Sequence, residues 1–267
     1  MSFALRERVE GRILGALQCV DATTRVPITE PLIVSATDAR LSRNHSGLYV
    51  IRSWSRLAAH EAPFEAPPAA PAIGSETLVL QIHDPAARYL TRRVAIALPR
   101  DPNAANAEQA GSLFRAVEVP MYPAASAPLS ANWVELRVTV RDIAGGDGLG
   151  GALLRVVTPS GVLARGLTDW RGEGLVPVAG VPITTWSTEP GAVVITEIPA
   201  SLECYFDPAT GTRTPAAAVR AGTIPGTLPV PDPQAIEDGR GALPQSITPV
   251  VLAAGRALAV TISITVP

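Results

Sequence analysis

The sequence contains no lysine, only three histidines and two cysteines, and 4% aromatic residues. Charged residues occupy 17% of its 267 positions and the formal net charge is −2, so the basic surface that binds nucleic acid is missing. No apolar run reaches transmembrane length, and the first residues, MSFALRERVEGR, lack the apolar core of a signal peptide. We therefore expect cytoplasmic synthesis and neither a nucleic-acid nor a membrane partner.

The histidines and cysteines form no catalytic or metal-binding motif. Cys19 and Cys204 are far apart in the sequence and make no CxxC pair, so we expect two buried free thiols. His45, His60 and His83 make neither an HxH nor an HExxH motif, and the sequence has no GxSxG nucleophile elbow. We predict no enzyme activity, no cofactor and no metal site.

One glycine-rich turn formally matches the dinucleotide-binding pattern GxGxxG, through Gly146, Gly148 and Gly151. Such a site requires a helix to begin at the glycines, because the helix N-terminus faces the pyrophosphate. The residues that follow are ALLRVVTP, which are typical of a strand, so the pattern indicates a hairpin loop. Asp142 and Asp147 in this turn lack the further carboxylates that a calcium site needs.

Hydrophobic residues recur at every second position along many short segments, which is typical of half-buried strands. The closing segment RALAVTISITVP predicts a strand that runs to the last residue, and NWVELRVTV predicts another. Further strands are expected in PLIVSA, GLYVIRSW, ETLVLQIHD, RVAIALP, FRAVEVPMY, ALLRVVTP, EGLVPVAG, AVVITEI and SLECYFD. With 22 glycines and 26 prolines, the chain favours turns over helices, and we expect at most short helices at residues 104–110 and 216–221.

The proline- and alanine-rich segment PMYPAASAPLS, residues 120–130, has the composition of a linker. We place a domain border near Ser126, with one β-sandwich over residues 1–125 and a second over residues 126–267. Residues 207–244 are rich in proline, glycine and threonine and are too long for a plain turn. They are either an inserted excursion with a function or partner of its own, or a partly disordered segment.

The two halves repeat one plan of strand, turn, strand, turn and strand. In the second half the plan has a strand that ends in Asp142, then Gly151 and Ala152 before a strand, then Thr168, Asp169 and Gly172. This pattern resembles the carboxypeptidase regulatory-like family, which has the transthyretin (prealbumin) fold. The first half matches it less fully, with Asp21, Asn44 and Gly47. The resemblance implies an all-β chain of two tandem prealbumin-like or immunoglobulin-like sandwiches, with the long insertion in the second.

Asp, Asn and Gly at these positions also have a purely structural explanation, since they are the residues that tight turns require. Trp170 stands in the expected turn TDWRGEG, near Arg165 and Arg171, a combination typical of interface anchors. We predict these three residues as interface candidates. The alternative is a tryptophan that folds back over the end of the sandwich.

An apolar, all-β chain without recognisable chemistry fits a structural protein that acts by contact with other subunits. Its layout, and segments such as RYLTRRVAIALPR, resemble accessory proteins of phage-tail-like contractile injection systems. That resemblance implies protein partners in a larger particle, bound through strand edges and loops, with Val260, Ile262 and Ile264 of the final strand as candidate interface residues. The alternatives are a surface adhesin or glycan-binding module, for which Trp170 is the candidate, and a cryptic hydrolase that uses His45 or His83.

Overall fold

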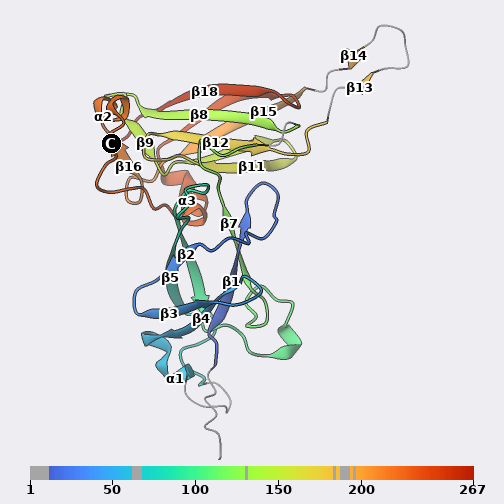
Figure 1. Cartoon of the computed structure of the whole chain (residues 1–267), viewed down its shortest axis with the longest axis vertical. Coiled ribbons are helices and arrows are strands. Elements are labelled where there is room, and N and C mark those ends of the chain that lie inside the picture. Colours follow the sequence, from blue (N-terminus) through green and yellow to red (C-terminus); the bar gives the residue numbers. More distant parts are fainter. Residues whose placement is uncertain (1–11, 62–67, 130–131, 183–184, 187–192, 195–196) are drawn as a thin grey trace, which may run out of the picture. The chain divides into compact units, whose positions relative to one another are not determined.

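Figure 1 shows a computed structural model of the chain, which describes residues 12–61, 68–129, 132–182, 185–186, 193–194 and 197–267. The chain divides into two compact units. Of the described residues, 12–19, 28–61, 68–80 and 95–119 form the first unit, and 20–27, 81–94, 120–129, 132–182, 185–186, 193–194 and 197–267 form the second. The border near Ser126 remains a prediction.

The strands of the first half of the chain form two sheets, with the orders β3-β4-β1-β7 and β2-β5-β6. Side chains alternate between buried and exposed along β5 and β6, as the period-two pattern predicts. Helices are short, as expected. The elements are β1 (Gly15–Asp21), β2 (Ile33–Ser35), β3 (Ala39–Arg43), β4 (Tyr49–Trp54), the 3-10 helix η1 (Ser55–Leu57), α1 (Ala58–Glu61), β5 (Glu76–His83), β6 (Arg92–Leu98), the 3-10 helix η2 (Ala104–Asn106) and β7 (Val117–Met121).

The second unit contains a sandwich of two larger sheets (Figure 1). One sheet has the order β11-β10-β15-β17; the other has the order β12-β8-β9-β16, with β18 added alongside β8. The elements are β8 (Val134–Asp142), β9 (Gly148–Gly150), β10 (Leu153–Thr158), β11 (Gly161–Leu167), β12 (Glu173–Val178), β13 (Thr185–Trp186), β14 (Val193–Val194), β15 (Ile198–Tyr205), β16 (Thr212–Thr214), α2 (Ala216–Ala221), α3 (Pro233–Gly239), the 3-10 helix η3 (Arg240–Ala242), β17 (Gln245–Leu252) and β18 (Ala257–Ile264). The prediction of an all-β fold is confirmed.

A single hydrophobic core fills the sandwich of the second unit. Both sheets contribute every second side chain to it, and most of these side chains are fully buried. Aliphatic side chains packed at such density are the main source of stability in a fold of this kind. The core includes Val134, Leu136, Val138 and Val140 of β8, Leu154 and Val156 of β10, Leu202 and Cys204 of β15, Val250 and Leu252 of β17, and Ile262 and Ile264 of β18.

The structure corrects one expectation from the sequence and decides between the two alternatives left open for another. The final strand ends at Ile264 and does not run to the last residue, although Val266 still packs against the core. The excursion of residues 207–244 is a folded segment, because it holds β16, α2, α3 and η3. Here β16 pairs with β9, and the side chain of Ile236 in α3 is 2% exposed.

The glycine-rich turn leads into strands and not into a helix, as predicted. Gly148 lies in β9, Gly151 follows it with a positive φ of 84°, and β10 begins at Leu153. Close packing explains why glycine is needed here. A Cβ at Gly150 would lie 2.8 Å from the Asp169 carbonyl oxygen, so the turn that carries Asp169 packs directly on β9.

The aspartate and asparagine side chains of the repeated plan mostly act as turn residues. Asn44 accepts from the Leu48 N–H at 2.8 Å, and Asp169 accepts from the Arg171 N–H at 2.8 Å. Asp142 differs, because its carboxylate is buried and forms an ion pair with Arg213 of β16. The repeated residues therefore share a role in turn geometry. Asp142 in addition binds an arginine from another strand, β16.

Replacement of Gly172 by alanine is expected to destabilise the second unit by about 2 kcal/mol or more. Gly172 has a φ of +78°, and an added Cβ would collide with the Val140 carbonyl oxygen and lie 2.9 Å from the Leu149 nitrogen. Gly226→Ala is the matched control, because its Cβ would meet nothing within 4 Å. Equal unfolding midpoints for the two variants in chemical denaturation would contradict this account.

Candidate interaction surface of the second unit

The pairing register of the sheet β11-β10-β15-β17 arranges its outward side chains in rows. Residues directly opposite each other in antiparallel strands share one face of the sheet. Four such rows cross the outer face. The first is Leu167, Leu153, Tyr205 and Gln245; the second is Arg165, Arg155, Glu203 and Ile247; the third is Val162, Val157, Ser201 and Pro249; the fourth is Pro199 and Val251.

Helix α3 covers the first two rows where they cross β11, β10 and β15. The helix begins at an Asp-Pro pair, since Asp232 accepts from the Gln234 N–H at 3.1 Å and Pro233 occupies the first turn, where no N–H donor is required. Beneath the helix, Ile236 joins a small cluster with Leu153, Leu167, Tyr205 and Tyr122. This cluster is separate from the sandwich core and fixes α3 to the outer face of the sheet.

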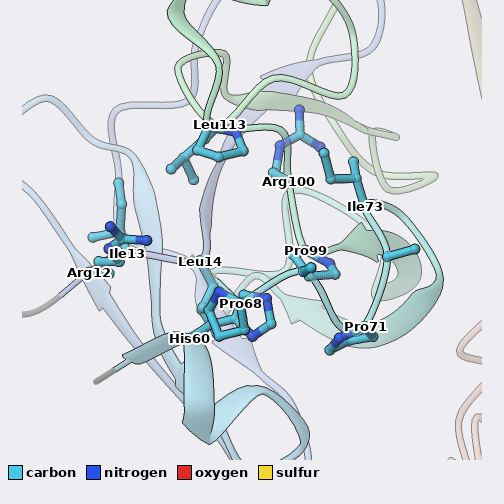
Figure 2. A pocket seen from close by; sticks show the side chains of 13 residues that line it. Arg12, Ile13, Leu14, His60, Pro68, Pro71, Ile73, Pro99, Arg100 and Leu113 are labelled. Carbon is cyan, nitrogen blue, oxygen red and sulfur yellow. The ribbon is translucent and has the colours of Figure 1, made fainter. Parts of the chain in front are cut away.

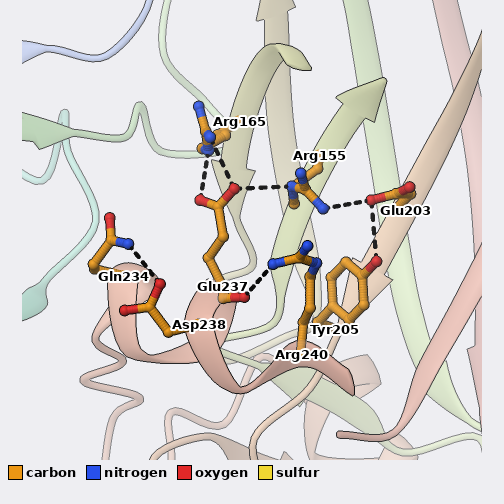
Figure 3. Close-up of polar contacts among 8 residues, drawn as sticks. All are labelled: Arg155, Arg165, Glu203, Tyr205, Gln234, Glu237, Asp238 and Arg240. Atoms are coloured by element: carbon orange, nitrogen blue, oxygen red, sulfur yellow. Dashed lines mark hydrogen bonds and ion pairs between the residues drawn. The ribbon is translucent and has the colours of Figure 1, made fainter. Parts of the chain in front are cut away.

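An ionic network joins α3 to the second row (Figure 3). Glu237 accepts from Arg165 Nε at 2.9 Å and Nη2 at 2.8 Å, and its Oε1 lies 3.3 Å from Arg155 Nε. Arg155 Nη1 donates to Glu203 at 2.7 Å, and Tyr205 Oη donates to the same carboxylate at 3.1 Å. Arg155 and Arg165 balance Glu203 and Glu237 in charge, so this partly buried network carries no net charge.

The network shifts the pKa values of its members in the expected directions. Hydrogen bonds from Arg165 lower the pKa of Glu237, against the opposing effect of burial. The same hydrogen bond raises the pKa of Arg165. Both side chains are therefore ionised at neutral pH, and the pair holds α3 in place as a charge-assisted contact with two parallel hydrogen bonds.

In the third and fourth rows, Val157, Val162 and Ser201 are half-buried and the other three residues are exposed. Val251 is 43% exposed and Ile247, at the end of the ionic row, is 59% exposed. Pro199 and Pro249 are exposed as well. We call this apolar area the open rows, defined by Val157, Val162, Ser201, Pro249, Pro199 and Val251.

The predicted anchors Trp170, Arg165 and Arg171 do not form one exposed patch. Trp170 is half-buried, and the Arg171 guanidinium lies 5.8 Å from its ring centroid. Arg171 is also paired with Asp169 at 2.7 Å, and Arg165 is engaged by Glu237. Trp170 lines a small hollow of about 80 Å³ with Pro229 and other residues. It therefore lies near residues 228–231 of the long insertion. Its interface role remains a prediction.

The candidate residues of the final strand face the core. Ile262 and Ile264 are each 1% exposed, and Val260 is half-buried against the core. These side chains hold the strand on the sandwich and leave little surface for a partner. What β18 offers outward is its backbone edge, because among the described residues it pairs only with β8, in parallel register.

The residues considered for catalysis lie in ordinary structural surroundings. His45 is exposed in a turn, and His83 Nδ1 lies 3.0 Å from Thr91 Oγ1. Asp84 is buried and accepts from the Ala86 and Arg88 N–H groups, which makes it a turn residue between β5 and β6. Over the described residues, no three histidine, cysteine, aspartate or glutamate side chains gather as a metal site.

Comparison with known proteins adds little to this picture. No protein-family model matches the sequence, and no curated protein matches it either. Similarity assigns no family. Among the helices that the structure describes, none is long and apolar enough to cross a membrane.

Solved structures give only distant matches. The TIE protein of Bacillus anthracis is 10% identical over 95% of this chain and 33% of its own, with a TM-score of 0.23. BcpA, the major pilin subunit of Bacillus cereus, is 10% identical over 96% of this chain and 60% of its own, with a TM-score of 0.23. The shaft pilin SpaA of Lactobacillus rhamnosus GG is 12% identical over 97% and 98%, with a TM-score of 0.20. The chain spans one third of the first protein, and likeness at this level assigns no function.

Replacement of Glu237 by glutamine is expected to destabilise the second unit by about 2 kcal/mol at pH 7, because Arg165 and Arg155 lose a charged partner. The pKa of Glu237 is lowered in the folded state, so its contribution is present above the unfolded-state value of about 4.3 and is lost as the pH falls through the folded-state value. Denaturation curves of the wild type and Glu237→Gln should therefore converge in acid.

Glu197→Gln provides the control for this measurement. Glu197 lies 3.7 Å from Arg256, and the two side chains are 54% and 57% exposed, so water screens their attraction. We expect this variant to match the wild type at every pH. A Glu237→Gln protein as stable as Glu197→Gln at pH 7 would show that the network does not hold α3.

Proposed function

We propose that this chain is a non-catalytic structural protein that joins neighbouring subunits of a larger assembly through the free edge of β18. The observation that supports this function best is an eight-residue edge strand with no proline, no charged residue and, among the described residues, no strand paired with its outer side. Along Ala257–Ile264, described pairing occupies one side of the strand only. The other side presents backbone N–H and C=O groups to which a strand of another subunit can add.

The two neighbouring edges of the sandwich differ in how well they are protected. Strand β17 ends the opposite sheet and contains Pro249, which lacks a backbone N–H and interrupts an edge. Strand β18 has neither proline nor charge, and its exposed side chains are Ala257, Ala259, Thr261 and Ser263. Small side chains let a second strand approach, so β18 is the better acceptor. The open rows add apolar surface on the other sheet of the same sandwich.

We propose further that the assembly is a phage-tail-like particle of the contractile injection type. This finer proposal draws on the overall layout of the sequence and on its tandem β organisation. A subunit held within such a particle needs a stable fold and a strand edge that can pair with a neighbour. The sandwich core of the second unit and the edge of β18 would meet these two needs. Genes for sheath or tube subunits beside the gene for this chain would support it, and pilus-assembly genes in their place would contradict it.

The double substitution Ala259→Lys and Thr261→Lys tests the edge. Both positions are exposed on β18, and lysines on an edge strand oppose the approach of another strand. In cells that make the particle, wild-type chain should sediment with complexes far larger than 27.8 kDa, and the variant should remain in the light fractions. Thermal unfolding of the purified variant checks that its fold is retained.

Ala217→Lys on α2 is the matched control, since it adds a lysine at an exposed alanine that belongs to a helix and to neither β17 nor β18. It should enter the particle like the wild type. Incorporation of the β18 variant at the wild-type level would refute strand addition, and a wild-type chain that is always light would refute the assembly role itself.

A glycan-binding role is the second candidate, because one hollow of the second unit combines an aromatic ring with polar groups. It has a volume of about 380 Å³ and is lined by Trp133, Tyr89, Asp21 and Arg88, among others. Tyr89 Oη donates to Asp21 at 3.0 Å, which fixes the phenol beside the hollow. Aromatic faces with nearby hydrogen-bonding groups are suited to sugar rings.

If this hollow binds glycans, Trp133→Ala should weaken the response on a glycan array by about tenfold or more, because a stacking surface is lost. Trp170→Ala is the comparison, since Trp170 lines a different and smaller hollow. An array without any response from the wild type excludes this candidate. If only Trp170→Ala lowers the array response, the glycan site lies at the turn of residues 169–172 instead.

A further inference from the structure

The first unit contains a cavity that the assembly role leaves unexplained (Figure 2). It has a volume of about 390 Å³, which falls in the range of small-ligand sites, and its walls are mainly aliphatic and proline side chains. In Figure 2, Leu113 and Arg100 lie on one side of the space, while His60, Pro68 and Pro71 lie on the other. The lining also includes Leu14, Ile73 and Pro99.

Two buried nitrogen-bearing side chains line this apolar space. His60 is 5% exposed, and its Nδ1 atom has no hydrogen-bond partner among the described residues. A buried polar atom without a partner costs free energy, so an orphaned imidazole nitrogen indicates a missing acceptor or donor. Since His60 belongs to α1 and lines the cavity, a ligand in the cavity is the natural source of that partner.

Arg100 adds positive charge to the same lining. It is 8% exposed, and its Nε and Nη2 atoms donate to three carbonyl oxygens, those of Ser112 at 2.9 Å, Ala110 at 2.5 Å and Arg115 at 3.3 Å. These acceptors are neutral, and within the described part of the chain Arg100 has no ion pair. Burial, followed by the nearby charge of Arg115, lowers the pKa of Arg100.

The described lining includes no aspartate or glutamate, whereas Arg100 and His60 both belong to it. An apolar cavity with positive charge and an unused hydrogen-bonding nitrogen selects a ligand with an apolar body and a single negative group. We propose that this cavity binds a small apolar carboxylate whose charged group accepts a hydrogen bond from His60 Nδ1, with its apolar body against Leu14, Pro71 and Ile73, while the positive charge of Arg100 on the other side of the cavity favours the anion.

Binding can be measured by isothermal titration calorimetry of the full chain with benzoate and with hexanoate. We expect saturable one-site binding with a Kd of about 1 mM or lower for at least one of them, as ligands of this size allow. Benzyl alcohol and hexanol, which lack the charge, should bind at least about tenfold more weakly. Equal affinity of acid and alcohol, or no saturable binding of either acid, would overturn the proposal.

Substitutions locate the site. Ile73 is 58% exposed at the rim, so Ile73→Glu should fold normally while its negative charge weakens carboxylate binding by about tenfold or more. His60→Leu fills the same part of the lining with an apolar side chain and removes the imidazole nitrogen. It should therefore also weaken carboxylate binding. Ile224→Glu is the matched control, since Ile224 is 65% exposed in the second unit. Carboxylate binding unchanged in Ile73→Glu would refute the site even if His60→Leu fails to fold.

Discussion

The second unit depends on one constraint, which is that the inward side chains of two sheets must fill a common core. Alternate residues of β8, β10, β15, β17 and β18 meet this demand, and most are fully buried. Once the inward residues are fixed, the pairing register fixes the outward ones, because a shift by one residue would turn every side chain to the other face. The row of Arg165, Arg155 and Glu203 is therefore a consequence of the core.

The strands that were predictable are those in which alternation extends over several residues. Val134–Asp142 and Ala257–Ile264 each show a clean period of two, and both are strands in the structure. The sequence did not predict β3, β9, β11, β16 or β17. For β9 and β16 the reason is that each has three residues, and Gly148–Gly150 offers little hydrophobic pattern. Their pairing is decided by a close backbone approach that only glycine permits.

The candidate site was predictable in its residue types and not in its geometry. An exposed role was expected for Arg165, but Glu237, which is 72 residues further along the chain, engages it with two hydrogen bonds. The Asp-Pro pair at 232–233 is a local signal for the start of α3, whereas nothing local indicates the sheet face that α3 covers. Ile236 and Glu237 reach that face because adjacent helix positions contact the apolar row and the ionic row, respectively.

The absence of lysine bears on how this surface can bind a partner. Every basic side chain is an arginine, whose planar group forms paired bonds with carboxylates, and Arg155, Arg165, Arg171 and Arg213 are engaged in this way or in single ion pairs. Arginines that are neutralised within the fold contribute little long-range attraction, and with a net charge of −2 electrostatic steering is weak. Under the proposed assembly role, recognition would therefore rely on short-range contacts. Two kinds need no charge: the backbone edge of β18 that no described strand pairs, and the apolar side chains of the open rows.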